Sequence, residues 1–548
     1  MPEPRHILVA VAWPYAQGSL HLGHIAGAYL PPDIFARYHR LAGNRVLMVS
    51  GSDVHGTPIT VKADQEGVSP QEIVERYHPE FLGYWDALGI SFDLFTTTGT
   101  DNHIRVAREF FSRLLENGHL YQKVTDQFYD EEKGQFLPDR YIEGTCPHCG
   151  YPQARGDQCD NCGRTLDPSD LIDPKSKLTG TTPVLRQTEH YYWRLSAFNE
   201  RLEEWLASRE GWRPHVLNFA LGMVREGLHD RSFTRDLDWG IPIPVDDIGP
   251  GKSIYVWWEA VMGYYSAAQE WAQIQGAPDA WKAWWTDPEA ESYYFVGKDN
   301  IPFHAVYWPA LLMGHGELNL PTDVPANQYV TFGGHKASKS RGVGRSLGWY
   351  LDRLEPDAIR FALASVLPEQ NDTDLSDEEI VRRVNEELVA TWGNLVNRVL
   401  NLIARNFEGR VPEPGELEDE DRELLAGIDA ALVTEARHIE AVELRAGLRT
   451  AMEAAGLANT YLTATEPWKL AKSDPGRAGT VLWTALSALA GIRVGFAPYL
   501  PFSSDSLGHL IGLGPVNEWS RPQLTIGAEL GEPTPLFVKL DIDVLADE

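Results

Sequence analysis

Two histidines three residues apart, His21 and His24, are the first candidates for chemistry in this sequence. They follow an apolar run at residues 7–12 that is typical of a strand buried on both faces of a parallel sheet. We expect Ser19 to cap a helix that begins at Leu20, which places both imidazoles in its first turn. A helix N-terminus at the carboxyl end of such a strand binds phosphate, and imidazoles there can donate hydrogen bonds to a phosphoryl group. Taken alone, a histidine pair of this spacing is more often structural.

A second group of residues, far along the chain, supplies positive charge. Lys336, Ser338 and Lys339 lie in a loop rich in glycine, and two ammonium groups in such a loop can clamp a phosphate. A solvated charge run is the alternative for this loop alone. Gly23, between the two histidines, leaves room for a flat ligand to approach the backbone. Together the two groups predict a nucleotide site.

Further candidates for a binding pocket follow predicted strands. Asp53 comes just after a strand at residues 45–49, where it can pair with an ammonium group or simply cap a turn. Trp257, Ala260 and Tyr264 recur at helical spacing, which suits either core packing or a wall for an apolar substrate. A third buried strand, near residues 293–296, is followed by Asp299 and then by two more candidates, Phe303 and His304.

All four cysteines form two CxxC pairs separated by nine residues, with a glycine after each pair. Four thiolates in this spacing predict a tetrahedral, structural Zn²⁺ site. Dithiol redox chemistry is the alternative, but a reducing compartment favours metal. The predicted ligands are Cys146, Cys149, Cys159 and Cys162.

Length and composition limit the class of protein. A chain of 548 residues with 43% hydrophobic and 23% charged residues is typical of a globular protein of three or four domains. A net charge of −30 argues against general nucleic-acid affinity but allows one local basic groove. No targeting signal is present at the start, and the most apolar stretch, 481–496, contains Arg493 and precedes Pro498. We expect that stretch to be a core helix too short for a bilayer, no membrane partner, and a cytoplasmic location.

The order of predicted elements indicates a Rossmann-like, doubly wound parallel α/β sheet with a zinc-knuckle insertion, followed by an all-α helix bundle. Apolar residues from Val384 to Ile403 step by three or four, which predicts an amphipathic helix. The expected divisions are 1–118 and 189–330 for the two halves of the sheet domain, 119–188 for the insertion, 331–375 for the lysine loop and linker, 376–510 for the bundle, and 511–548 for a tail that packs on the body.

These motifs together resemble the methionyl-tRNA synthetase family of class I aminoacyl-tRNA synthetases. The resemblance covers nearly the whole chain, and its matching stretches are residues 14–24, 51–58, the cysteine pairs, 234–242, 297–299, 336–340, 394–398 and 467–468. Ala337 stands where the lysine motif usually has Met, and Trp13 and Val261 differ from some members in the pocket region. The chain ends without an appended dimerisation domain, so we expect a monomer.

The resemblance implies methionine activation by Mg²⁺-bound ATP, followed by transfer of methionine to the 3′ adenosine of tRNA(Met). It implies catalytic roles for His21, His24, Lys336 and Lys339, with Gly23, Asp299 and Ser338 also contacting ATP. It implies that the amino acid is held by Trp13, Tyr15, Asp53, Trp257, Ala260, Tyr264, Phe303 and His304, and the anticodon by Asn394, Arg398 and Trp468. The alternatives are a class I synthetase for another apolar amino acid, a non-catalytic paralogue, and a nucleotidyltransferase that shares the fold.

Overall fold

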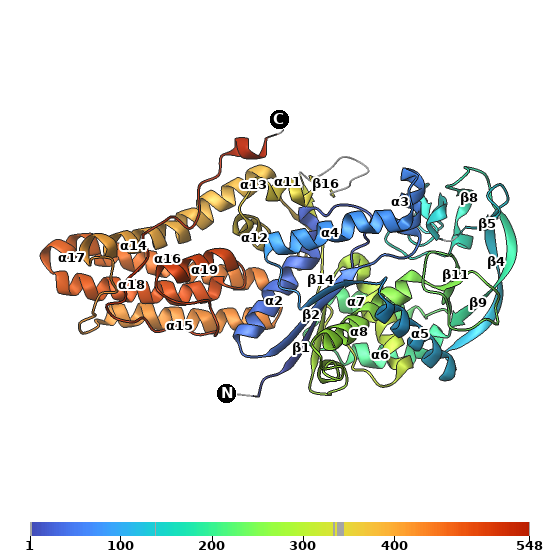
Figure 1. The fold of residues 1–548 in the computed structure, drawn as a ribbon, viewed down its shortest axis with the longest axis horizontal. Coiled ribbons are helices and arrows are strands. Elements are labelled where there is room, and N and C mark those ends of the chain that lie inside the picture. Colours follow the sequence, from blue (N-terminus) through green and yellow to red (C-terminus); the bar gives the residue numbers. More distant parts are fainter. Residues whose placement is uncertain (1–2, 138, 333–334, 337–344, 547–548) are drawn as a thin grey trace.

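The computed structural model describes residues 3–137, 139–332, 335–336 and 345–546. A parallel five-stranded sheet lies at the centre of an α/β body, and a helix bundle extends from one side of that body (Figure 1). The strand order β14-β13-β1-β2-β3 confirms the predicted doubly wound sheet. The strands are β1 (His6–Val11), β2 (Arg45–Ser52), β3 (Leu94–Thr97), β13 (Glu291–Gly297) and β14 (Ala326–Asn327).

The central strand β1 is buried on both faces, as its apolar run predicts. Ile7, Val9 and Val11 enter the core formed with α2 (Leu30–Leu41) and α4 (Pro70–Leu88). Leu8 and Ala10 enter the opposite core. That core is formed with α5 (Asp101–Glu116), α8 (Val256–Ile274) and α10 (Trp308–His315). Alternate side chains of one strand therefore hold both helical layers.

The helix after β1 begins later than its sequence predicts. The expected start at Leu20 with Ser19 as cap is wrong, because α1 (Leu22–His24) has His21 as its N-cap residue in an extended conformation. The His21 backbone N–H donates to Nδ1 of His24 over 3.2 Å, so the His24 imidazole takes the part that a glutamate plays in a capping box. The helix continues through a π-helical turn (Ile25–Tyr29) into α2.

The insertion is built on a long antiparallel pair, β4 (Leu120–Asp130) and β9 (Val184–Trp193), at the end of the body far from the bundle (Figure 1). A small sheet, β7-β6-β8, carries the cysteine pairs between its strands. Its strands are β6 (Ile142–Thr145), β7 (Ala154–Arg155) and β8 (Ile172–Ser176). Shorter strands complete this region, namely β5 (Gln135–Phe136), β10 (Arg231–Ser232), β11 (Thr234–Asp236) and β12 (Lys252–Ile254).

Between residues 376 and 510 the chain is mostly helical, as predicted. The apolar stripe from Val384 to Ile403 is buried along its length. Two short helices, α11 (Leu347–Leu351) and α12 (Pro356–Ala364), lead into the bundle. The bundle contains α13 (Asp377–Arg382), a π-helical segment (Arg383–Gly393), α14 (Asn394–Asn406), α15 (Asp419–Glu440), α16 (Leu444–Thr465), α17 (Pro467–Ser473), α18 (Pro475–Phe496) and α19 (Pro501–Leu510).

The most apolar helix, α18, is longer than expected. It has 22 residues because it begins at Pro475 rather than near 481, so by length and composition it could cross a bilayer, and the expectation that it is too short is wrong. In the described chain it is the one such helix, and 94% of its most apolar window is buried inside the molecule. The expected core role is confirmed.

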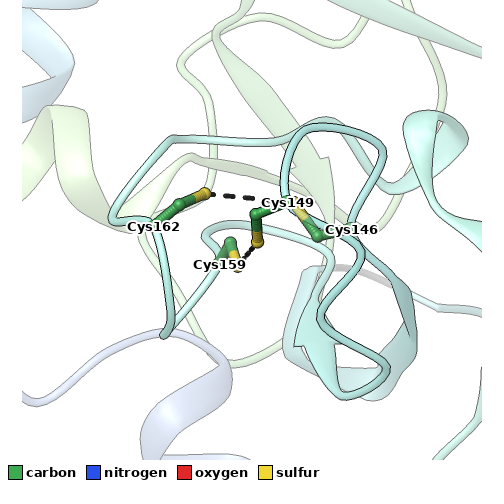
Figure 2. Close-up of side chains that lie close together, drawn as sticks. All are labelled: Cys146, Cys149, Cys159 and Cys162. Atoms are coloured by element: carbon green, nitrogen blue, oxygen red, sulfur yellow. Dashed lines mark hydrogen bonds between the residues drawn. The ribbon is translucent and has the colours of Figure 1, made fainter.

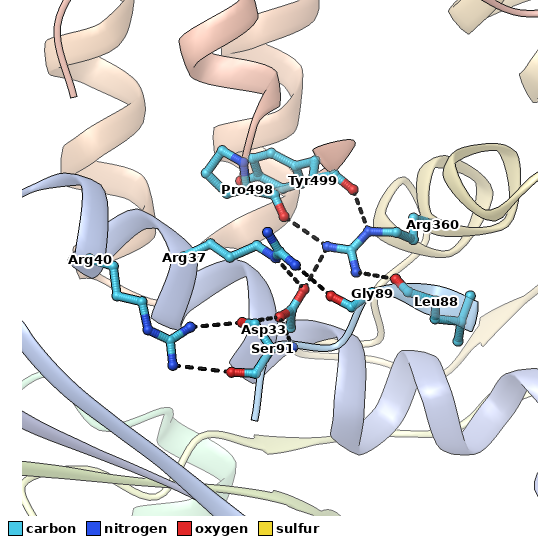
Figure 3. Close-up of polar contacts among 9 residues, drawn as sticks. All are labelled: Asp33, Arg37, Arg40, Leu88, Gly89, Ser91, Arg360, Pro498 and Tyr499. Atoms are coloured by element: carbon cyan, nitrogen blue, oxygen red, sulfur yellow. Dashed lines mark hydrogen bonds and ion pairs between the residues drawn. The ribbon is translucent and has the colours of Figure 1, made fainter. Parts of the chain in front are cut away.

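A buried arginine joins the body to the bundle (Figure 3). Arg360 of α12 pairs with Asp33 of α2 over 2.7 Å, and both side chains are fully buried. The same guanidinium donates to the carbonyl oxygen of Leu88, at the end of α4, and to those of Pro498 and Tyr499, between α18 and α19. One side chain thus holds four segments that are far apart in the sequence.

The tail lies along the bundle and returns to the body. The Trp519 backbone N–H donates to Leu41 at the end of α2, and Arg521 pairs with Asp429 of α15 over 2.8 Å. Further on, Leu540 and Asn385 exchange two hydrogen bonds of 2.8 Å. The tail therefore contacts both parts of the molecule.

Replacing Asp33 by alanine should lower the free energy of unfolding by about 3–5 kcal/mol, because the Arg360 charge would stay buried without its partner. Although burial alone would raise the pKa of Asp33, Arg37 and Arg360 lower it to about 2. The pair's contribution is therefore present above the usual carboxyl pKa and is lost as the pH falls toward 2. Urea denaturation at pH 7 measures the predicted loss in the free energy of unfolding.

The control is Glu203→Ala, which removes the partner of Arg225 in an exposed ion pair. This variant should change the free energy of unfolding by no more than about 0.5 kcal/mol. Equal losses in the two variants would contradict the role given to the buried pair.

Candidate active site

A cavity of about 190 Å³ lies at the carboxyl ends of β1, β2 and β13. All eight residues predicted to hold the amino acid line it, and so does Asp299. The loop after β1 contributes Trp13 and Tyr15, and the end of β2 contributes Asp53. The remaining lining residues are Trp257, Ala260, Val261 and Tyr264 of α8, Asn300, Phe303 and His304 after β13, Ala12, and Arg140 and Gln158 of the insertion.

Aromatic rings form the wall of the cavity. The Trp13 indole is wedged against two glycines, since a Cβ atom on Gly51 or Gly263 would lie 2.1 or 2.6 Å from that ring. The Trp257 indole N–H donates to the Tyr15 hydroxyl over 2.6 Å. These fixed rings suit an apolar ligand chain.

The part of the cavity lining formed by His304 and Tyr264 carries no formal charge. His304 Nδ1 lies 2.9 Å from the Asn300 carbonyl, which can only accept, so this nitrogen carries the proton. His304 Nε2 then accepts from the Tyr264 hydroxyl at 2.7 Å. Burial lowers the pKa of His304 to about 4, so the ring is neutral at pH 7.

Asp53 adds a buried carboxyl to the lining of the cavity. Asp53 is only 2% exposed, and its Oδ1 accepts from the His55 backbone N–H at 3.3 Å. Burial, and then the negative charge of Glu259, raise the pKa of Asp53 well above its usual value. A cationic group of a ligand would favour the ionised form of this carboxyl.

The insertion closes one side of the cavity through Arg140. Its guanidinium lies 5.5 Å from the centre of the Tyr15 ring, and its Nε donates to Asp157 over 2.7 Å. The sequence does not predict that Arg140 and Gln158 line the cavity. Neither residue belongs to a motif, and only the tertiary contact brings them to the cavity.

The two histidines of the first motif are stacked, with ring centroids 3.7 Å apart and planes 25° apart. Gly23 cannot be enlarged without moving His21, because a Cβ atom would lie 3.0 Å from that imidazole. The same Cβ position is 3.6 Å from the carbonyl oxygen of Val330, the first residue of β15 (Val330–Phe332). The first motif therefore lies against β15.

The second motif begins beside the first. Strand β16 (His335–Lys336) pairs with β15, with Lys336 opposite Thr331, while Ser338 and Lys339 lie outside the described residues. The Leu347 backbone N–H then donates to Leu20, just before the first motif. A third strand, β17 (Thr373–Asp374), completes this sheet. Asp299, which is exposed, accepts a hydrogen bond from the Tyr329 hydroxyl nearby.

The four cysteine sulfurs converge, each within 4.8 Å of the others (Figure 2). Cys149 and Cys159 are 3.6 Å apart, and Cys146 and Cys162 are 4.0 Å apart, too far for disulfides. Tetrahedral metal–sulfur bonds of about 2.3 Å place sulfurs roughly 3.8 Å apart, so this group can bind a metal ion.

The three predicted anticodon residues lie at the far end of the bundle, on α14 and α17. The Arg398 guanidinium is 5.6 Å from the centre of the Trp468 ring, which is 36% exposed. Asn394 is exposed one helical turn before Arg398. The structure thus brings Arg398 and Trp468 together on the surface.

Comparison with known proteins gives the class of protein that this fold and site define. The family described as "tRNA synthetases class I (M)" matches residues 7–400, and "Anticodon binding domain of methionyl tRNA ligase" matches residues 411–545. A crystal structure of Mycobacterium tuberculosis methionyl-tRNA synthetase bound by methionyl-adenylate is similar, with a TM-score of 0.81, 29% identity, and coverage of 98% of this chain and 100% of that chain. The chain has the architecture of a class I aminoacyl-tRNA synthetase.

Curated relatives identify the family within this class. The methionine–tRNA ligase of Roseiflexus sp. (strain RS-1) is 52% identical over 100% of this chain and 98% of its own length. That of Thermomicrobium roseum is 48% identical over the same shares. The chain belongs to the methionyl-tRNA synthetase family.

Proposed function

We propose that this chain joins methionine to tRNA(Met) in two steps, through a methionyl-adenylate. One observation carries the proposal: a single cavity is lined by a buried carboxyl, by several aromatic rings and by a neutral histidine. An amino acid with a charged head and an apolar side chain matches this arrangement. The cavity lies between the ends of β1 and β13, where doubly wound sheets bind their ligands.

In this proposal the methionine ammonium group pairs with Asp53. The thioether chain runs toward Tyr264 and His304, whose neutral hydrogen-bonded pair leaves no buried charge beside it. The wall around the chain would consist of Trp13, Tyr15, Trp257, Ala260 and Phe303. The insertion residue Arg140 would exclude water on the open side.

ATP would lie over the first motif, with Gly23 allowing close approach and Asp299 at the cavity mouth. An oxygen of the methionine carboxylate attacks the α-phosphorus of Mg²⁺-bound ATP, and pyrophosphate leaves. His21 and His24 would donate hydrogen bonds to the phosphates as charge develops. Lys336 and Lys339 would bind the departing pyrophosphate, and Ser338 would contact ATP. The pairing of Lys336 opposite Thr331 supports this assignment for the start of the loop.

Zn²⁺ is the metal we propose for the cysteine group. Four thiolates with these sulfur separations fill a tetrahedral site and leave no position open for substrate. The ion would therefore fold the insertion rather than take part in the reaction. This role matters to the active site because Arg140 and Gln158 come from the same insertion.

The bundle would read the anticodon. Trp468 offers an exposed ring for stacking on an unpaired base, with Asn394 and Arg398 beside it to bond base edges. A ribose hydroxyl of the 3′ adenosine of the tRNA would then attack the carbonyl carbon of the adenylate in the cavity, and AMP would leave. We also propose that the chain is a monomer and that it acts in the cytoplasm. Size-exclusion chromatography with light scattering tests the oligomeric state.

The test of the function is amino-acid-dependent ATP–pyrophosphate exchange, run with each standard amino acid. Exchange with methionine alone is the expected result. Exchange with another apolar amino acid would assign a different substrate, and exchange with none would indicate a non-catalytic paralogue.

Methionine affinity should rise with pH. Because burial raises the pKa of Asp53 in the empty cavity, acid favours the protonated form, which cannot pair with an ammonium group. The KM for methionine in the exchange assay should therefore fall as the pH rises through the Asp53 pKa. Asp53→Asn should raise that KM on the order of 10²-fold and remove this part of the pH dependence. An unchanged pH profile in Asp53→Asn would contradict the assignment.

Replacing Trp468 by alanine should spoil tRNA charging and leave exchange nearly intact. A lost base stack costs about 1–3 kcal/mol, which corresponds to roughly 5- to 150-fold in kcat/KM for tRNA. The control is Leu457→Ala, which removes another exposed side chain of the bundle and should affect neither step. Equal damage to both steps in Trp468→Ala would show that this residue only packs the bundle.

The purified chain should hold one zinc ion, measured by atomic emission. Cys159→Ala should lose that ion, expose the insertion to proteolysis and reduce exchange. His148→Ala is the matched control, because His148 is exposed between two of the cysteines and should not be needed for zinc. Full zinc content in Cys159→Ala would exclude the four-thiolate site.

A further inference from the structure

A carboxylate that belongs to no motif lies buried near the Asp53 carboxyl. Glu259 of α8 has 0% exposure and lies one residue before Ala260 in the cavity wall. Burying a carboxylate is costly unless donors surround it. Here two imidazoles supply them: His55 Nδ1 lies 2.8 Å from one oxygen, and His103 Nε2 lies 2.6 Å from the other.

The two imidazoles connect Glu259 to different parts of the cavity. His55 also donates its backbone N–H to Asp53, so Glu259 holds the turn that carries the Asp53 carboxyl. His103 comes from α5, and its Nδ1 lies 2.8 Å from the Ser266 hydroxyl. The His103 ring also lies beside the Trp13 indole, with centroids 6.3 Å apart. The network around Glu259 therefore supports both the Asp53 carboxyl and the wall of the cavity formed by Trp13.

The network also places a second negative charge near the first. Burial alone would raise the pKa of Glu259, but His55 and His103 together lower it, so this carboxylate is ionised at pH 7. The other charged or titratable groups near Asp53 are Tyr15, after β1, and Arg140, from the insertion. A bound ammonium group would favour the ionised form of Asp53 and would then lie in the negative potential of both carboxylates, in an interior where charges are screened less than in water.

We propose that Glu259 is a positioning residue for recognition of the substrate ammonium group, acting through His55 and Asp53. It would orient the Asp53 carboxyl and strengthen the negative potential that selects a cationic head. This inference rests on the proposed function, because it takes Asp53 as the partner of the ammonium group. A purely structural role, in which Glu259 only satisfies two buried imidazoles, is the alternative that the test must separate.

The test compares two inhibitors of methionine-dependent exchange. Methioninol keeps the ammonium group, whereas 4-(methylthio)butan-1-ol has the same chain without it. In the unaltered protein, methioninol should bind more tightly than the second alcohol. In Glu259→Gln, which keeps the shape but removes the charge, that preference should fall on the order of tenfold, while the inhibition constant of the ammonium-free alcohol stays the same. Glu259→Asp should restore part of the preference.

The control is Glu270→Gln, on the same helix, where the carboxylate accepts from Thr96 away from the cavity. It should leave the preference unchanged. If Glu259→Gln folds poorly, His55→Gln tests the same link and should reduce the preference for methioninol likewise. Weaker binding of both alcohols by the same factor would overturn the inference in favour of the structural role, and so would an unchanged preference.

Failure of this inference and failure of the proposed function give different results. If Asp53→Asn raises the KM for methionine but Glu259→Gln leaves the preference for methioninol intact, only the role of Glu259 is wrong. If the unaltered protein shows no methionine-dependent exchange, the proposed function is wrong.

Discussion

The parallel pairing of β1 with β13 is the constraint on which the site depends. Val11 lies opposite Phe295, so the chain segments that follow the two strands leave the sheet at the same edge. Trp13 and Tyr15 follow one strand, and Phe303 and His304 follow the other. Parallel pairing requires long crossover connections, and here the insertion and several helices fill them. The cavity exists because two strands from distant parts of the chain end together.

Charge is distributed unequally around that cavity. Asp53 lines the cavity with the buried carboxylate of Glu259 behind it, whereas the lining also holds His304, which burial keeps neutral. A second group of buried charges in the described chain has a structural role instead. The Asp33–Arg360 pair is not part of the lining of this cavity and joins helices of the body and the bundle (Figure 3). It makes the position of the bundle depend on the body that carries the active site.

Much of this organisation is predictable from local patterns. The apolar run of β1, the helical stripe from Val384 to Ile403 and the two CxxC pairs are each specified by a few neighbouring residues, and the structure contains all of them. The start of the first-motif helix is not predictable in this way. Its N-cap backbone N–H donates to an imidazole of the helix itself, which propensity rules for capping residues do not anticipate. Helix α18 is longer than the apolar stretch 481–496 predicts, because it begins at Pro475, a residue that suits the first turn of a helix.

Sequence alone determined the class of fold, the four thiols that converge and the eight predicted residues that line the cavity together, because spacing, periodicity and family resemblance are all read from the sequence. Only the tertiary structure decided that Arg140 and Gln158 close the cavity and that Glu259 supports Asp53. It also decided that His304 is neutral. The physical reason is that burial, and the partner of a buried charge, are set by which distant segments pack together, and no local pattern records that choice.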